Sequence, residues 1–300
     1  MPSIFAMSHL GILFSIFFAV SYHSFKSPEE ILPYRPVENY PNDQLLEKIA
    51  EKRAMVINAH DDDMCGIVGT LSQLKAKGWK IVVLTIPQSD ERNTAHRKAC
   101  KKLSDSVAFF SVNYPEFRTD WGTNKTPYSA IPVAEFGNIF HSEKLEQEII
   151  QRVNSFQPSV IFTLDHEIGG YGHPEHVLVC STVLKLAQTK KINLPYLYQS
   201  VYAPSMMEKI MERHSKRMIS WGFPGDGWEK AKQIYQLKTL PQPTVQINIQ
   251  SEAQVKMNWL FSYNERERKT MDFYVPAFGQ YSAEKYFEVF DREFFRVFNF

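Results

Sequence analysis

Two short clusters in the sequence combine side chains that commonly bind metal ions. They are HDDD at residues 60–63 and HPEH at residues 173–176. Each cluster places such side chains three positions apart, and each follows an apolar, β-branched run, at residues 55–59 and 160–164. In an open α/β sheet, the loops at the carboxyl ends of the strands hold ligands and catalytic groups. We therefore expect the two clusters to face one another across one crevice and to form a catalytic metal site.

Three residues of the clusters match the ligand set of a catalytic zinc ion. Such a site usually has three protein ligands, drawn from histidine and carboxylate, and keeps one position for water. His60 and Asp63 from the first cluster and His176 from the second supply this set. Because the same ligands also suit iron, cobalt and manganese, we expect Zn²⁺ or another divalent metal such as Fe²⁺.

Each cluster has one further reactive group. Asp62 lies between two ligands, where its carboxylate can accept a proton from the water that such a metal acidifies to a pKa of ~7. His173 lies close to His176 and could donate a proton to a developing oxyanion or to a leaving amine. The predicted reaction is the metal-assisted hydrolysis of an unactivated bond such as an amide.

Each cluster taken alone has a simpler, structural explanation. Three aspartates before a helix can cap its N-terminus and interact with its dipole, and an isolated histidine pair is more often structural. The two clusters together, each after a strand and with complementary residue types, favour a metal site. One of Asp165, His166 and Glu167 could orient a metal-bound imidazole, or these residues could form a solvated loop.

The elements that must position the clusters alternate between strand and helix. Strands are expected at residues 53–59, 80–86, 106–112, 159–164 and 196–202. Helices are expected at residues 43–52, 66–77, 91–103, 143–156 and 175–189. This alternation predicts an α/β fold with a mostly parallel sheet and helices on both faces.

The rest of the chain is less regular. Residues 113–140 are rich in proline, glycine, asparagine and aromatic residues, and an irregular stretch of this length usually has a function or is mobile. An edge strand is expected at 245–249, one or two helices at 252–274, and an amphipathic segment that docks on the core at 286–298.

The composition is that of an ordinary globular protein. The 300 residues are 44% apolar and 22% charged, which favours one α/β domain with excursions. The net charge of +1 argues against a nucleic-acid binder, which needs a concentrated positive face. Cys65, Cys100 and Cys180 are odd in number and include no CxxC pair, so we expect neither a disulfide framework nor a cysteine-rich zinc site.

The N-terminal residues are typical of an export signal or an anchor. Residues 10–20 are almost entirely apolar and residues 19–21 (Ala-Val-Ser) match a signal-peptidase site, but residues 1–9 contain no lysine or arginine. A cleaved signal, an uncleaved membrane anchor and a soluble packing segment all remain open. We expect an exported protein (periplasmic or extracellular), or one anchored to a membrane only through this segment. The expected organisation is a signal or anchor at 1–21, a linker at 22–42 and the catalytic domain at 43–300.

Both clusters and their surroundings resemble the PIG-L/LmbE-like zinc-dependent N-acetylglucosaminyl deacetylases. The first motif of that family, (A/P)HPDDE after the first strand, stands here as AHDDDM at residues 59–64. Its second motif, HPDH after a glycine-rich turn, stands here as GGYGHPEH at residues 169–176. The order, separation and α/β rhythm are similar over roughly residues 50–200. The resemblance implies a Rossmann-like fold and the removal of an acetyl group from an N-acetylated amino sugar.

The resemblance also implies roles for the same five residues. The zinc ligands would be His60, Asp63 and His176. Asp62 would be the general base, and His173 would act as an acid or stabilise the tetrahedral intermediate.

Some positions depart from the family pattern. Asp61 replaces the proline and Met64 replaces the glutamate. Neither position is a ligand or the base, although like-charge repulsion from Asp61 could alter the pKa of the base or the metal affinity. The family tends to have an arginine and a glutamate early in the helix after the second strand. Here Arg92 and Arg97 are the candidate substrate-binding residues, and His96 stands at the expected glutamate position.

Two other functions stay open at this point. The changes at Asp61 and Met64 would suit a catalytically silent carbohydrate-binding protein with the same fold, which should contain no stoichiometric zinc. A metallohydrolase that cleaves a different amide or an ester is the second alternative. The only partner that the sequence predicts is a small amino-sugar substrate, and it gives no oligomeric state.

Overall fold

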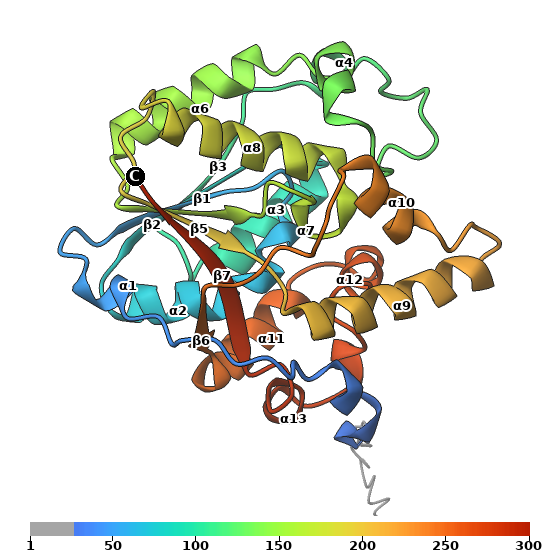
Figure 1. Cartoon of the computed structure of the whole chain (residues 1–300). Coiled ribbons are helices and arrows are strands. Elements are labelled where there is room, and N and C mark those ends of the chain that lie inside the picture. The colour runs from blue at the N-terminus through green and yellow to red at the C-terminus, as the bar shows by residue number, and fades with distance from the viewer. Residues whose placement is uncertain (1–26) are drawn as a thin grey trace, which may run out of the picture.

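A seven-stranded sheet lies at the centre of the structure, a computed structural model that describes residues 27–300 (Figure 1). The strand order is β3-β2-β1-β4-β5-β7-β6. The strands are β1 (Arg53–Ile57), β2 (Lys80–Thr85), β3 (Ser106–Phe109), β4 (Val160–Leu164), β5 (Tyr196–Ser200), β6 (Val245–Asn248) and β7 (Arg292–Asn299). The predicted signal or anchor at residues 1–21 lies outside the described residues. Within residues 27–300, no helix has the length and apolar character needed to cross a bilayer.

Most of the sheet is parallel. Strands β1 to β5 pair in parallel, whereas β7 pairs antiparallel with β5 and with β6. Residues 54–57 of β1 are all buried, as are residues 160–163 of β4, and such continuous buried runs are typical of strands covered on both faces. The predicted fold class, a mostly parallel α/β sheet with helices around it, is confirmed.

Helices cover both faces of the sheet (Figure 1). Met55 and Ile57 pack toward α6 (Glu143–Phe156) and α8 (Pro174–Gln188). Side chains alternate along a strand, so Ala54 and Val56 pack in the opposite core. The helices that contribute to that core include α2 (Val68–Ala76), α3 (Asp90–Cys100), α11 (Ala253–Phe261) and α13 (Ala283–Phe287). The remaining helices are α1 (Leu45–Lys48), α4 (Tyr114–Phe117), α5 (Phe136–Ile139), α7 (Gly169–Gly172), α9 (Pro204–Ser220), α10 (Gly227–Ile234) and α12 (Glu265–Met271).

The segment at 286–298, expected to dock on the core, ends as a strand inside the sheet. β7 lies between β5 and β6, and β6 is the edge strand that the sequence predicts. The buried ring of Phe295 lies 5.7 Å from the rings of Phe162 and Tyr198. The segment therefore docks on the core through backbone pairing as well as through its aromatic side chains.

The segment expected to be a linker packs on the domain over its described part. Ile31 is 1% exposed, the ring of Tyr34 stacks on Phe290 at 6.3 Å, and the ring of Tyr40 contacts Phe294 at 5.9 Å. Residues 27–42 therefore belong to the folded unit, because their aromatic side chains complete the core beneath β7.

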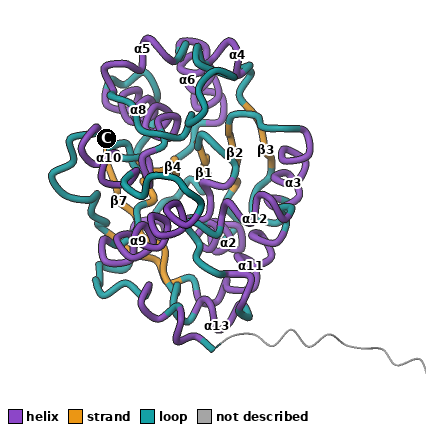
Figure 2. The backbone as a smooth tube through the Cα atoms, turned by 90° about the vertical axis from the view of Figure 1, so that its right-hand side faces the viewer, coloured by secondary structure: helices purple, strands orange, loops and turns teal. Residues whose placement is uncertain are grey.

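Two helices beyond β5 lie on one side of the molecule, and Figure 2 looks at that side. The first of them, α9, carries a group of basic residues at 213–217. Arg213 and Arg217 both bind Asp272, each at 2.6 Å. These ion pairs join α9 to the end of α12.

Candidate metal centre

The structure brings the three predicted metal ligands together. His60 follows β1, Asp63 lies in the short 3₁₀ segment η3 (Asp62–Gly66), and His176 lies in the first turn of α8. His60 Nδ1 is 2.8 Å from His176 Nε2, and Asp63 Oδ1 is 3.0 Å from His176 Nε2 and 3.9 Å from His60 Nδ1. Three ligand atoms from the loops after β1 and β4 thus surround one point.

The spacing of these three atoms fits a metal ion. Bonds of 2.0–2.1 Å in tetrahedral geometry separate two ligand atoms by roughly 3.3 Å. The three observed separations, 2.8, 3.0 and 3.9 Å, lie on both sides of this value. One divalent ion can therefore contact all three atoms after small side-chain movements.

The hydrogen bonds of the two imidazoles also fit a bound cation. His60 Nε2 donates to Glu175 Oε2 at 2.9 Å, and His176 Nδ1 donates to the carbonyl oxygen of Gly169 at 2.8 Å. With the outer nitrogens acting as donors, Nδ1 of His60 and Nε2 of His176 face each other and are the nitrogens left to bind a metal ion. This arrangement is the one in which outer partners orient metal-binding histidines.

His173 completes the cluster as a hydrogen-bond donor. Its Nδ1 accepts the backbone N–H of Glu175 at 3.2 Å and caps α8, and its ring stacks on His176 at 4.6 Å. Burial and the neighbouring imidazoles of His176 and His60 hold the pKa of His173 well below its usual value. The neutral ring must carry its proton on Nε2, because Nδ1 accepts a hydrogen bond.

The part of the chain that carries this cluster matches a known protein family. Residues 55–187 match the family described as PIG-L: GlcNAc-PI de-N-acetylase. This span is a PIG-L domain. It contains most of β1, all of β4, most of α8 and all five residues predicted to bind the metal or to act in catalysis.

Individual proteins are similar to the PIG-L domain and its surroundings. A 1D-myo-inositol 2-acetamido-2-deoxy-alpha-D-glucopyranoside deacetylase of Rhodococcus opacus (strain B4) is 25% identical over 211 residues, which cover 60% of this chain and 71% of that protein. The N,N′-diacetylchitobiose deacetylase of Pyrococcus horikoshii is 12% identical, with a TM-score of 0.47, 85% of this chain and 86% of that chain covered. The 4-carboxy-2-hydroxymuconate hydratase GalB of Pseudomonas putida KT2440 is 14% identical, with a TM-score of 0.47 and coverages of 74% and 82%.

The unusual Asp61 of this PIG-L domain is paired with an arginine. Arg92 Nη2 lies 2.6 Å from Asp61 Oδ1 and 2.7 Å from Asp62 Oδ1, and Arg92 Nη1 lies 3.3 Å from Glu267 Oε2. Burial and the charge of Asp62 raise the pKa of Asp61 to about 6. The arginine therefore offsets the extra carboxylate and fixes the side chain of Asp62.

The two candidate substrate-binding arginines are in different surroundings. Arg92 lies at the centre, with its guanidinium bound by carboxylates. Arg97 lies apart from the cluster, where it donates to the Val107 carbonyl and lies over the ring of Phe109. The substrate-binding role of Arg97 stays a prediction that these contacts do not support.

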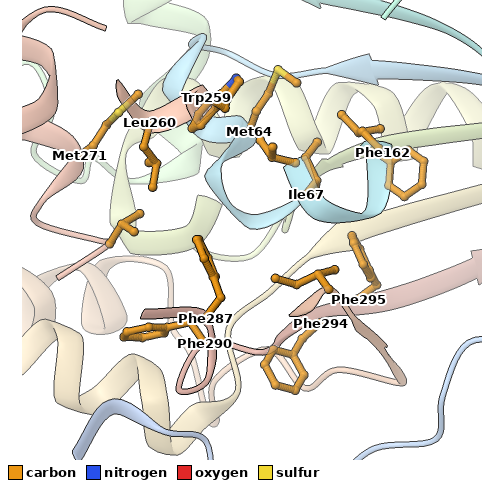
Figure 3. Close-up of a cluster of buried hydrophobic side chains, with 14 of the residues drawn as sticks. Met64, Ile67, Phe162, Trp259, Leu260, Met271, Phe287, Phe290, Phe294 and Phe295 are labelled. Atoms are coloured by element: carbon orange, nitrogen blue, oxygen red, sulfur yellow. The ribbon is translucent and has the colours of Figure 1, made fainter. Parts of the chain in front are cut away.

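Two other departures of the PIG-L domain belong to the core. Met64 is fully buried and faces Ile67 and Trp259 (Figure 3). His96, at the expected glutamate position, is buried with Nδ1 3.0 Å from the Tyr263 hydroxyl, and burial together with Arg92 lowers its pKa to about 3. Met64 thus anchors η3, the segment that carries Asp62 and Asp63, to the hydrophobic core.

The loop after β4 orients His176 through its backbone. Asp165 accepts the backbone N–H groups of Ile168 at 2.8 Å and Gly170 at 2.6 Å, among others. Gly169 has a φ of 57°, and a Cβ there would lie 2.5 Å from the Cβ of His176. Of the three residues considered at 165–167, Asp165 therefore acts on the imidazole indirectly, by shaping the loop that presents the Gly169 carbonyl.

The residues that bind the outer nitrogen of His60 were not predicted from the sequence. The buried Glu175 binds His60 with one carboxylate oxygen and accepts Arg118 Nη1 on the other at 2.8 Å, and the Tyr114 hydroxyl lies 3.2 Å away. Burial alone would raise the pKa of Glu175, but the hydrogen bond from His60 and the nearby cations hold this pKa well below its usual range. The only signal in the sequence was the acidic residue between the two histidines of the second cluster.

We expect Glu175→Gln to weaken metal binding by about 10–100-fold, the usual cost of losing an outer partner of a metal-bound histidine. The amide is nearly isosteric but has lost its charge, and one of its two positions becomes a donor that faces His60 or Arg118. Titration of the metal-free protein with Zn²⁺ measures the change.

The control for this experiment is Glu148→Gln. Glu148 is also buried and binds Arg152 at 2.6 Å, but it lies on α6 without contact to the cluster. Equal Zn²⁺ affinity of both variants would show that the contact between Glu175 and His60 does not matter for metal binding.

Proposed function

We propose that the protein is a metal-dependent hydrolase that removes the N-acetyl group from an amino-sugar derivative of the N-acetylglucosamine type. The observation that carries this proposal is the convergence of His60, Asp63 and His176 beside Asp62 and His173 in a PIG-L domain. The description of the family and the name of the Rhodococcus relative, which both refer to the deacetylation of an amino sugar, support the choice of bond.

The ligand set is proposed to hold Zn²⁺, with Fe²⁺ as the alternative. When bound, such an ion polarises a carbonyl oxygen and acidifies water. His60, Asp63 and His176 would hold it, and the hydrogen bonds that the two imidazoles donate to Glu175 and to the Gly169 carbonyl fix the orientation of both rings.

The remaining residues have separate roles in the proposed reaction. Asp62, held by Arg92, takes a proton from the attacking water and returns it to the nitrogen that leaves. His173 donates Nε2–H to the carbonyl oxygen as this atom becomes negative. A C–O bond forms, the C–N bond breaks, and the products are acetate and a free amine.

The test is the release of acetate and of a primary amine from N-acetylated amino sugars, including one linked to inositol. The metal-loaded protein should release both in equal amounts. Treatment with a chelator should abolish the reaction, and added Zn²⁺ or Fe²⁺ should restore it.

Two negative results point to the alternative functions. A protein that binds the metal stoichiometrically but releases no amine from any N-acetylated sugar would be a hydrolase of another amide or ester. A protein that binds carbohydrate but no metal would be the catalytically silent binding protein.

A further inference from the structure

An apolar cavity begins at the carboxylates of Asp62 and Asp63. Its volume is about 60 Å³, and its lining includes none of the three histidines of the cluster. The apolar walls come from the ends of β4 and β5 and from the helices on the side shown in Figure 2; they include Ile168, Val201, Met207, Trp228, Leu240 and Met271. The side chains of Trp228 and Met271 are 6% and 2% exposed. The cavity therefore continues the proposed active site into the hydrophobic interior.

The position of the cavity limits which part of a substrate can enter it. In the proposed reaction the amide carbonyl lies at the metal ligands and Asp62. One substituent of the carbonyl is the nitrogen with its sugar, whose hydroxyl groups would lose water without gaining partners in an apolar cavity. The other substituent is the acyl chain, which is slim and apolar. The cavity thus suits the acyl side of the bond.

Two tyrosines are among the residues that lie between this cavity and a second one. Tyr202 and Tyr274 line both this cavity and a second one of about 30 Å³, which extends toward Phe287 and Phe290. The Tyr202 hydroxyl lies 3.5 Å from Cys65 Sγ and donates to the Tyr274 carbonyl at 3.4 Å. Tyr202 is therefore fixed in the wall between the two cavities.

We propose that the first cavity is an acyl pocket and that the protein hydrolyses N-acyl amino sugars with chains longer than acetyl. This inference rests on the proposed function and deepens it. A cavity of 60 Å³ has room for roughly four to six water-sized groups, so a hexanoyl chain should fill it. The reaction consumes one water, breaks the C–N bond and releases a medium-chain carboxylic acid and the free amine.

A chain-length series tests the acyl pocket. The metal-loaded full chain is assayed with glucosamine carrying N-acetyl, N-butyryl, N-hexanoyl and N-decanoyl groups. Each methylene that leaves water contributes about fourfold to binding, so kcat/KM for hexanoyl should exceed that for acetyl at least tenfold. The decanoyl substrate should be poorer than hexanoyl, because Tyr202 lies between the two cavities. An optimum at acetyl would overturn the inference.

Substitutions in the walls give a second test. Leu240→Trp should lower the ratio of kcat/KM for hexanoyl to that for acetyl by at least tenfold, because the indole fills the cavity. Leu237→Trp is the matched control; Leu237 lies in the same loop but does not line the cavity, so the ratio should not change. Tyr202→Ala should move the optimum toward decanoyl by joining the two cavities. Equal ratios in all three variants would contradict the pocket.

Failure of the proposed function can be told apart from failure of this inference. If no N-acyl sugar is hydrolysed, the proposed function is wrong, and binding of N-acetylglucosamine and N-hexanoylglucosamine is then compared by calorimetry. The pocket requires hexanoyl to bind at least tenfold more tightly and to change the fluorescence of Trp228, measured against Trp228→Phe. Equal affinity would exclude an acyl pocket whatever the reaction.

Discussion

Asp62→Ala is expected to abolish hydrolysis and to leave the bound metal in place. General-base catalysis contributes about 10²–10⁴-fold to the rate, so kcat on an N-acyl amino sugar should fall by this factor. Asp62 also lies close enough to His60 and Asp63 to be a metal ligand itself. Elemental analysis of the purified variant therefore has to accompany the assay, because only loss of turnover without loss of metal identifies a base.

The control for this prediction is Asp272→Ala. The side chains of Asp62 and Asp272 are 20% and 22% exposed, and both bind arginine, but Asp272 pairs with Arg213 and Arg217 between α9 and α12. Its removal should leave kcat unchanged. Full activity of Asp62→Ala would show that the base is another residue, and loss of its metal would make Asp62 a ligand.

His176→Ala is expected to remove both the metal and the activity. The imidazole supplies a ligand atom that faces Asp63 and His60 at 3.0 and 2.8 Å. Its loss should lower the metal affinity by more than about 100-fold, since even outer partners cost 10–100-fold. A metal that binds the folded protein also raises its Tm, so saturating Zn²⁺ should stabilise the wild type and leave the Tm of this variant unchanged.

His214→Ala serves as the control for His176→Ala. His214 lies on α9, where its ring packs against Phe273 at 4.8 Å, and its loss should change neither metal content nor the response of Tm to Zn²⁺. A His176→Ala variant that binds Zn²⁺ as tightly as the wild type would remove the basis of the proposed metal centre.

The sequence was sufficient to predict the parallel sheet and the residues that meet at its edge. The buried strands are continuous apolar runs, as at residues 54–57, and the helix expected at 143–156 has these bounds in the structure. Ligands that follow two such strands converge when the strands are parallel neighbours, as β1 and β4 are. Local pattern and topology therefore agree at His60, Asp63 and His176.

The contacts that support these ligands could not be predicted in the same way. Arg118 is 57 positions from Glu175 and lies in a stretch without periodicity, so only the folded chain shows that the two side chains meet. The pairing of Asp61 with Arg92 likewise depends on how α3 packs beside η3. The strand at 292–299 was missed because a run of phenylalanines fits an amphipathic segment as well as a strand that is inserted into a sheet.

The two oxygens of the Glu175 carboxylate face different parts of the chain. One holds His60, and the other holds Arg118 on the irregular segment that follows β3. We therefore expect metal binding and the placement of that segment to be linked, and linkage requires each to favour the other by the same factor. A molecule that binds only the segment around Arg118 could thus change the affinity of the centre for its metal ion. The bound metal would in turn stabilise this segment without contacting it.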